Sequence, residues 1–126
     1  MGETTLTNSE WNVLNCLWKQ SPMTVMQLVA VLRETTGWAK STTITTLRRM
    51  EKKGLLCCEH NGRTRRYFPQ VERQQAAAHE TSFFLDKVYR GSVGRMVAAM
   101  ARNNTLSREE IDGLYLILKQ AEKGQM

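Results

Sequence analysis

The chain has 126 residues, 41% of them hydrophobic and 24% charged, with a formal net charge of +6 and an isoelectric point near 9.6. This length allows one domain, or a small domain with an extension, and the basic balance favours acidic partners. No apolar run approaches the roughly 20 residues that span a membrane, and the odd number of cysteines, three, argues against a secreted disulfide framework. We therefore expect a cytoplasmic protein without membrane insertion.

The excess positive charge belongs to the first half of the chain. Residues 1–70 hold ten Lys and Arg against five Asp and Glu, whereas residues 71–126 hold eight against seven. The pattern of elements also changes at residue 71. We therefore predict two domains, 1–70 and 71–126.

Two capped helices are predicted before Gly37. Thr7 and Glu10, and again Thr24 and Gln27, have the spacing of a capping box, in which each side chain accepts a hydrogen bond from the other residue's backbone N–H. Each helix carries an apolar stripe at helical spacing, formed by Trp11, Leu14, Leu17 and Trp18 in the first and by Val25, Leu28, Val29 and Leu32 in the second. The stripes predict that both tryptophans pack in a core instead of forming a binding platform.

A third helix is predicted over residues 40–53, with Ile44, Leu47 and Met50 on its apolar face and Gly54 as its stop. The opposite side carries Ser41, Thr42, Thr45, Arg49 and Lys52, with Arg48 at its edge. Small hydroxyl residues near the N-terminus and cations near the C-terminus suit a helix that enters a DNA major groove. Taken alone, the same face is explained equally well as a solvated one whose cations favour the helix dipole.

The next segment favours the first interpretation. Residues 55–60 and 65–69 read as two strands, and Asn61-Gly62 between them is a strong hairpin signal. The hairpin carries three cations, namely Arg63, Arg65 and Arg66. Three helices followed by a basic hairpin give the order of a winged helix–turn–helix, so residues 1–70 are predicted to bind double-stranded DNA.

Residues 71–126 predict three further helices, over 71–89, over 93–101 and from Ser107, where a third capping box begins. So short a segment closes little core alone, and its apolar faces need a partner, most simply the same segment of a second chain. The predicted dimerisation residues are Phe83, Phe84, Val88, Val93, Met96, Val97, Met100, Ile111, Leu114, Tyr115 and Leu118. The predicted fold class is thus mainly α with a small β-hairpin wing, a winged helix–turn–helix plus a C-terminal helical dimerisation domain.

Four segments resemble the penicillinase repressors of the BlaI/MecI type, and the likeness covers about residues 6–120. They are LTNSEWNVLNCLW (6–18), TTITTLRRMEKKG (42–54), KVYRG (87–91) and LSREEI (106–111). The resemblance implies a homodimer that binds a palindromic operator and blocks transcription. It also implies a membrane sensor-protease as a partner, which in that family senses a β-lactam and releases the repressor by cleavage. The family's Asn-Phe cleavage pair falls at Ala99-Met100, and these residues do not match it.

Other chemistry finds little support in the sequence. Cys57, Cys58 and His60 form the only Cys/His cluster, and adjacent strand residues point to opposite faces, so the two cysteines are not expected to share a metal. No glycine-rich phosphate loop and no nucleophile–base pair appear. We predict no enzyme activity, no metal site and no cofactor.

The patterns favour a sequence-specific DNA-binding protein, and the resemblance implies a transcriptional repressor of β-lactam resistance or another stress response. A rival hypothesis is a winged-helix module that binds an acidic protein. A further alternative keeps DNA binding but makes the protein an activator or an architectural factor.

Overall fold

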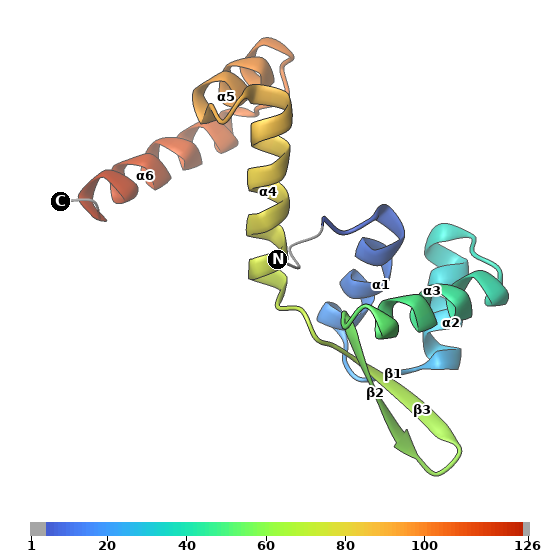
Figure 1. Ribbon diagram of the computed structural model, residues 1–126. Helices are drawn as coiled ribbons and strands as arrows, with labels where there is room; N and C mark the ends of the chain where they lie inside the picture. Colours follow the sequence, from blue (N-terminus) through green and yellow to red (C-terminus); the bar gives the residue numbers. More distant parts are fainter. Residues whose placement is uncertain (1–4, 125–126) are drawn as a thin grey trace. The chain divides into compact units, whose positions relative to one another are not determined.

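The computed structural model describes residues 5–124 of the chain. In chain order, the elements in Figure 1 are α1 (Asn8–Lys19), β1 (Met23–Thr24), α2 (Val25–Thr36), α3 (Lys40–Lys52), β2 (Leu56–Asn61), β3 (Thr64–Pro69), α4 (Arg73–Tyr89), α5 (Val93–Arg102) and α6 (Arg108–Gly124). No helix within the described residues is long and apolar enough to cross a membrane.

The chain divides into two compact units, one extending to Thr81 and the other beginning at Ser82. This division lies within α4, whereas the sequence analysis placed a domain boundary after residue 70. The first unit includes the start of α4 because that segment packs onto the helices before it. Trp18 Nε1 donates a 2.9 Å hydrogen bond to the Val71 carbonyl oxygen, and Ala76 is buried.

The predicted helix caps are confirmed. Thr7 and Glu10, Thr24 and Gln27, and Ser107 and Glu110 each exchange two backbone-to-side-chain hydrogen bonds. Gly37 ends α2 in the left-handed conformation, with a φ of 78°. Replacing an N-cap residue such as Thr7, Thr24 or Ser107 by Ala typically lowers stability by about 1 kcal/mol, so these three residues fix where their helices begin.

Three antiparallel strands form a small sheet in the order β1-β3-β2. The central strand β3 pairs with β2 from Leu56–Pro69 to Asn61–Thr64, and with β1 through Met23–Tyr67 and Thr24–Arg66. Strand β1 was not predicted, because two residues carry no periodicity. The winged-helix fold of this unit agrees with the prediction.

The turn of the hairpin lies one residue later than predicted. Asn61 is the last residue of β2 and pairs with Thr64, so the two-residue turn is Gly62-Arg63. Gly62 has a φ of 69°, and Arg63 is not among the residues with positive φ. A positive φ at the first turn position alone is the pattern of a type II′ turn, which favours glycine there.

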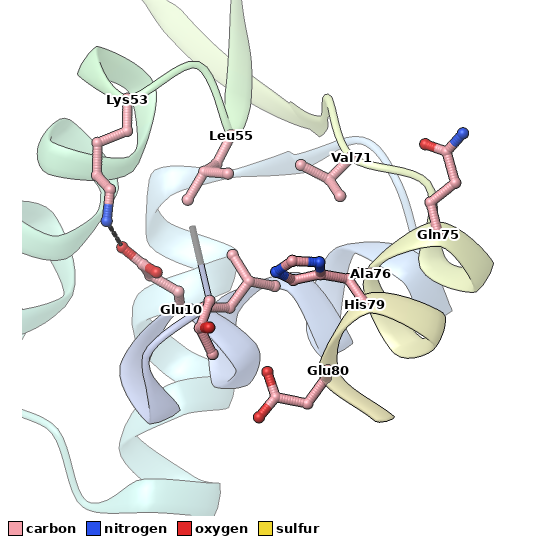
Figure 2. A pocket seen from close by; sticks show the side chains of 10 residues that line it. Glu10, Lys53, Leu55, Val71, Gln75, Ala76, His79 and Glu80 are labelled. Carbon is pink, nitrogen blue, oxygen red and sulfur yellow. Dashed lines mark hydrogen bonds and ion pairs between the residues drawn. The ribbon is translucent and has the colours of Figure 1, made fainter. Parts of the chain in front are cut away.

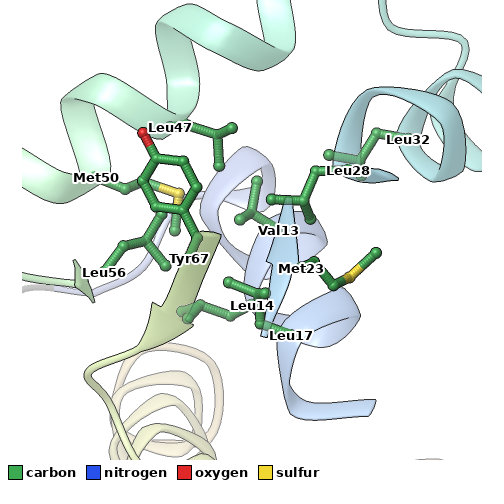
Figure 3. Packing of buried hydrophobic residues seen from close by; sticks show 10 residues of the cluster. All are labelled: Val13, Leu14, Leu17, Met23, Leu28, Leu32, Leu47, Met50, Leu56 and Tyr67. Carbon is green, nitrogen blue, oxygen red and sulfur yellow. The ribbon is translucent and has the colours of Figure 1, made fainter. Parts of the chain in front are cut away.

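Apolar side chains of α1, α2, α3 and the sheet form the core of the first unit (Figure 3). Figure 3 shows Tyr67 of β3 beside Leu47 and Met50 of α3, while Leu14 and Leu17 reach in from α1. Each of these side chains is at most 1% exposed. Burial of this kind contributes roughly 1.5–3 kcal/mol for a large apolar side chain, so the core holds α3 firmly by one face.

The end of α3 leads directly into the wing. Leu55 N–H donates to the Met50 carbonyl oxygen at 2.9 Å, and Gly54 N–H donates to that of Glu51 at 3.1 Å. These two bonds, with a φ of 83° at Gly54, make a Schellman motif. The motif ends α3 at Gly54, the stop that the sequence predicted, and the chain then turns into β2.

Candidate nucleic-acid interface

One face of α3 is packed and the other is open to solvent. Four residues face the core, namely Thr43, Thr46, Leu47 and Met50. Ile44, which the sequence analysis placed on the apolar face, is only half-buried, and the small Thr43 and Thr46 fill its expected place. The open side carries all six residues predicted to contact DNA from this helix: Ser41, Thr42, Thr45, Arg48, Arg49 and Lys52.

A shallow hollow of about 290 Å³ lies along this open face. It is lined by Ser9, Ser41, Thr42, Thr45, Thr46 and Arg49. Ser9 belongs to the first turn of α1 and was not predicted as a site residue. The sequence pattern showed it only as the residue before the Glu10 of a capping box, and nothing in that pattern shows that the start of α1 lies beside α3.

An ion pair between a buried carboxylate and a partly exposed lysine ties the start of α1 to the end of α3. The Glu10 side chain is 1% exposed and accepts hydrogen bonds from the Thr7 N–H and from Lys53 Nζ (Figure 2). Burial by itself raises the pKa of the Glu10 carboxyl. The Lys53 and Thr7 hydrogen bonds, with the charges of Lys53 and Arg49, outweigh burial and hold that pKa below its ordinary value. Glu10 is therefore ionised at neutral pH and fixes Lys53 at the end of α3.

A larger pocket of about 470 Å³ has both residues of this ion pair in its lining (Figure 2). Its lining residues are Thr5, Leu6, Glu10, Lys53, Leu55, Val71, Gln75, Ala76, His79 and Glu80. The residues predicted to contact DNA do not line it. We therefore place the candidate interface on the open face of α3 and on the wing, not at this pocket.

The cations of the wing point in different directions. Arg65 and Arg66 are adjacent on β3, so their side chains leave opposite faces of the hairpin. Arg65 shares the face of the buried Tyr67, which packs toward the helices, whereas Arg66 lies 3.7 Å from the carboxylate of its cross-strand neighbour Glu59. Arg63 is exposed in the turn itself. The hairpin therefore does not present its three arginines as one surface.

The cysteines behave as strand geometry predicts. Cys57 is exposed, while Cys58 is half-buried against the core on the other face. Within residues 5–124, no group of three or more His, Cys, Asp and Glu side chains is placed to hold a metal ion.

The second unit exposes a large apolar surface. Neither α5 nor α6 contains a buried residue. Of the predicted dimerisation residues, Phe83, Phe84, Val88, Val93, Met100, Tyr115 and Leu118 are exposed, while Met96, Val97, Ile111 and Leu114 are half-buried. Leu116 and Ile117 are also exposed and were not predicted, because residues 114–118 are all apolar or aromatic and helical spacing does not single out one stripe among them. Ala99 is half-buried and Met100 exposed on α5.

The family model described as penicillinase repressor matches residues 6–120. The chain belongs to the penicillinase repressor family. It is 31% identical to a penicillinase repressor of Bacillus licheniformis over 115 residues, which cover 91% of this chain and 90% of the relative. It is 24% identical to the methicillin resistance regulatory protein MecI of Mammaliicoccus sciuri, covering 91% of this chain and 94% of that protein.

One similar solved structure contains DNA. It is the monomeric form of Bacillus licheniformis BlaI in complex with the blaP half-operator, and it superposes with a TM-score of 0.51 at 28% identity. The superposition covers 56% of this chain and 87% of the solved one. Family membership identifies the protein as a DNA-binding transcriptional repressor of the winged-helix type, and not as an enzyme.

Proposed function

We propose that this repressor acts as a homodimer on a palindromic operator. The observation that carries the proposal is the open face of α3, where three hydroxyl residues precede three cations on one exposed surface. Ser41, Thr42 and Thr45 would face base edges, because the N-terminal part of a recognition helix reaches deepest into the major groove. Arg48, Arg49 and Lys52 would hold phosphates, which position the protein without reading sequence.

The wing adds phosphate contacts at one side of this helix. Arg63 is the strongest candidate, since it is exposed at the tip of the hairpin and no ion pair of the described residues engages it. Arg65 lies on the helix-facing side, while Arg66 is already close to Glu59. We therefore rank the wing contacts in the order Arg63, Arg65, Arg66.

The second unit supports the homodimer. Its exposed aromatic and aliphatic side chains, in α4 beyond Thr81 and in α5 and α6, make an apolar surface that a single chain leaves in water. A symmetric dimer covers such a surface and carries two recognition helices, which contact half-sites about 10 bp apart, centre to centre. The relatives are named for penicillinase and methicillin resistance, so we propose resistance or other stress-response genes as targets. A membrane sensor-protease as a partner rests on the family resemblance alone, because Ala99-Met100 does not match the family's cleavage pair.

Selection of bound duplexes from a random pool tests the proposal. We expect a palindromic consensus whose two halves are centred about one helical turn apart. Replacing Thr45 by Ala should change the preferred bases in each half, while replacing the exposed Thr35 of α2 should not. A pool without a consensus would reject sequence-specific repression and favour a module that binds an acidic protein.

A further inference from the structure

The hollow between α1 and α3 has the chemistry of an anion site. Its lining consists of hydroxyl residues and the guanidinium of Arg49, and no carboxylate lines it. The nearby Glu10 is buried and bound to Thr7 and Lys53, so its charge is already compensated. Thr46 Oγ1 donates to the Thr42 carbonyl oxygen at 2.8 Å. The side-chain hydroxyls of Ser41, Thr42 and Thr45 are the ones proposed to face bases, which leaves the Ser9 hydroxyl as a donor for a second ligand.

The first turn of α1, to which Ser9 belongs, also has two backbone donors without a partner. Glu10 N–H and Trp11 N–H donate to Thr7, at 3.2 Å and 2.9 Å. Asn8 N–H and Ser9 N–H find no acceptor within the part of the chain that the structure describes. Unpaired N–H groups at a helix start favour a negatively charged group, and Ser9 of this turn lines the hollow together with Arg49.

We propose that Ser9 of α1 and Arg49 of α3 together hold one phosphate of the DNA backbone in this hollow. The inference rests on the proposed function and adds a contact from outside the recognition helix. A phosphodiester carries one negative charge and two free oxygens, which match one guanidinium and one hydroxyl donor. Because the two residues come from different helices, the phosphate fixes α1 against the DNA and sets the depth of α3 in the groove.

Substitutions of Ser9 in the full-length chain provide the first test. Ser9→Ala removes one donor to a charged acceptor and should weaken binding to a 20-bp duplex about tenfold for each half-site. Ser9→Asp should weaken it about 100-fold by repulsion, yet raise the melting temperature, since a carboxylate in the first turn of a helix is favourable. Loss of binding with a gain in thermal stability separates a DNA contact from a folding defect. Ser21→Ala, at an exposed serine outside the hollow, is the matched control and should bind like the wild type.

Neutral methylphosphonates, placed one at a time along the duplex, identify the phosphate. At one position in each half-site, the affinities of wild type and Ser9→Ala should become equal, and Arg49→Ala should lose most of its effect there as well. Equal binding by Ser9→Ala and wild type on unmodified DNA, or a Ser9 effect that survives at every position, would overturn the phosphate site alone. Failure of the wild type to bind any duplex at low salt would overturn the proposed function, and the phosphate site with it.

Discussion

At the scale of single residues, Glu10 connects the geometry of the interface to the stability of the fold. Its carboxylate belongs to the capping box of α1 and also receives the hydrogen bond of Lys53, the residue that follows α3. A buried carboxylate is costly unless it is paired, and here both its oxygens have donors. The charge of Glu10 therefore adds to the apolar core in holding the end of α3 against the start of α1.

Replacing Glu10 by Gln should lower the free energy of unfolding by about 1–2 kcal/mol. The amide oxygen still accepts from the Thr7 N–H, but the charge that Lys53 requires is lost. The cost lies below the range for a fully buried pair because the Lys53 side chain is 41% exposed and regains water. Chemical denaturation at neutral pH measures the difference. Glu59→Gln breaks the exposed pair with Arg66 and should change stability by only a few tenths of a kcal/mol.

The same residue gives the fold an acid dependence. The pKa of Glu10 is lower in the folded chain than its ordinary value, so its stabilising contribution is complete above that ordinary value. The contribution is lost as the pH falls through the folded pKa. We expect the free energy of unfolding of wild type and Glu10→Gln to converge over this acidic range. Parallel pH curves for the two proteins would show that the carboxylate is not held as described.

At the scale of elements, the geometry of the wing hairpin predicts different roles for arginines that the sequence alone does not tell apart. Arg63→Ala should flatten the dependence of log K on log salt by about 0.9 for each half-site, because one phosphate contact is lost. Arg66→Ala removes the same charge. In the wild type, however, the Arg66 guanidinium lies close to the Glu59 carboxylate and on the opposite face of the hairpin from Arg65. The salt slope of Arg66→Ala should therefore stay near that of the wild type. Equal slopes for the two variants would mean that net charge, not position, decides binding.

The helices and their limits followed from the sequence because their signals are local. These signals act over a few residues and can be recognised in the sequence itself. They are the capping boxes at Thr7, Thr24 and Ser107 and the glycines at 37 and 54. The open face of α3 followed as well, since helical periodicity separates its cations from Leu47 and Met50.

The predictions failed where contacts between segments distant in the sequence determine the local structure. Strand β1 exists only through its pairing with Tyr67 and Arg66, and the turn moved by one residue because the ladder of the hairpin continues to Asn61–Thr64. Thr43 and Thr46 are buried although threonine is polar, because they share the packed face of α3 with Leu47 and Met50. Ser9 lines the hollow on α3 because the start of α1 lies beside that helix, which no local pattern encodes.

At the scale of the whole molecule, the proposed function requires two chains, and α6 provides the clearest place to test this. Leu118 is 62% exposed within one chain, so a charge there should leave the helices intact while opposing association. Leu118→Glu should raise the dissociation constant of the dimer at least about 100-fold, since a charge would be buried without a partner. Light scattering should then show the mass fall from twice 14.5 kDa to 14.5 kDa. Gln120→Glu adds the same charge to another exposed position of the helix and should remain dimeric only if Gln120 lies outside the interface.

The same variant decides how much of operator binding comes from pairing two recognition units. When one winged helix is bound, the second meets its half-site at an effective concentration near the millimolar range, which commonly adds 10²–10⁴ to the affinity. Leu118→Glu should therefore bind a duplex with one half-site as the wild type does, since the residues of the interface with DNA are unchanged. On a duplex with two half-sites it should lose roughly 100-fold or more. Equal losses of affinity on both duplexes would instead mean that the substitution destabilises the winged helix. Wild-type affinity on both duplexes would mean that the apolar surface of α6 does not join the two chains.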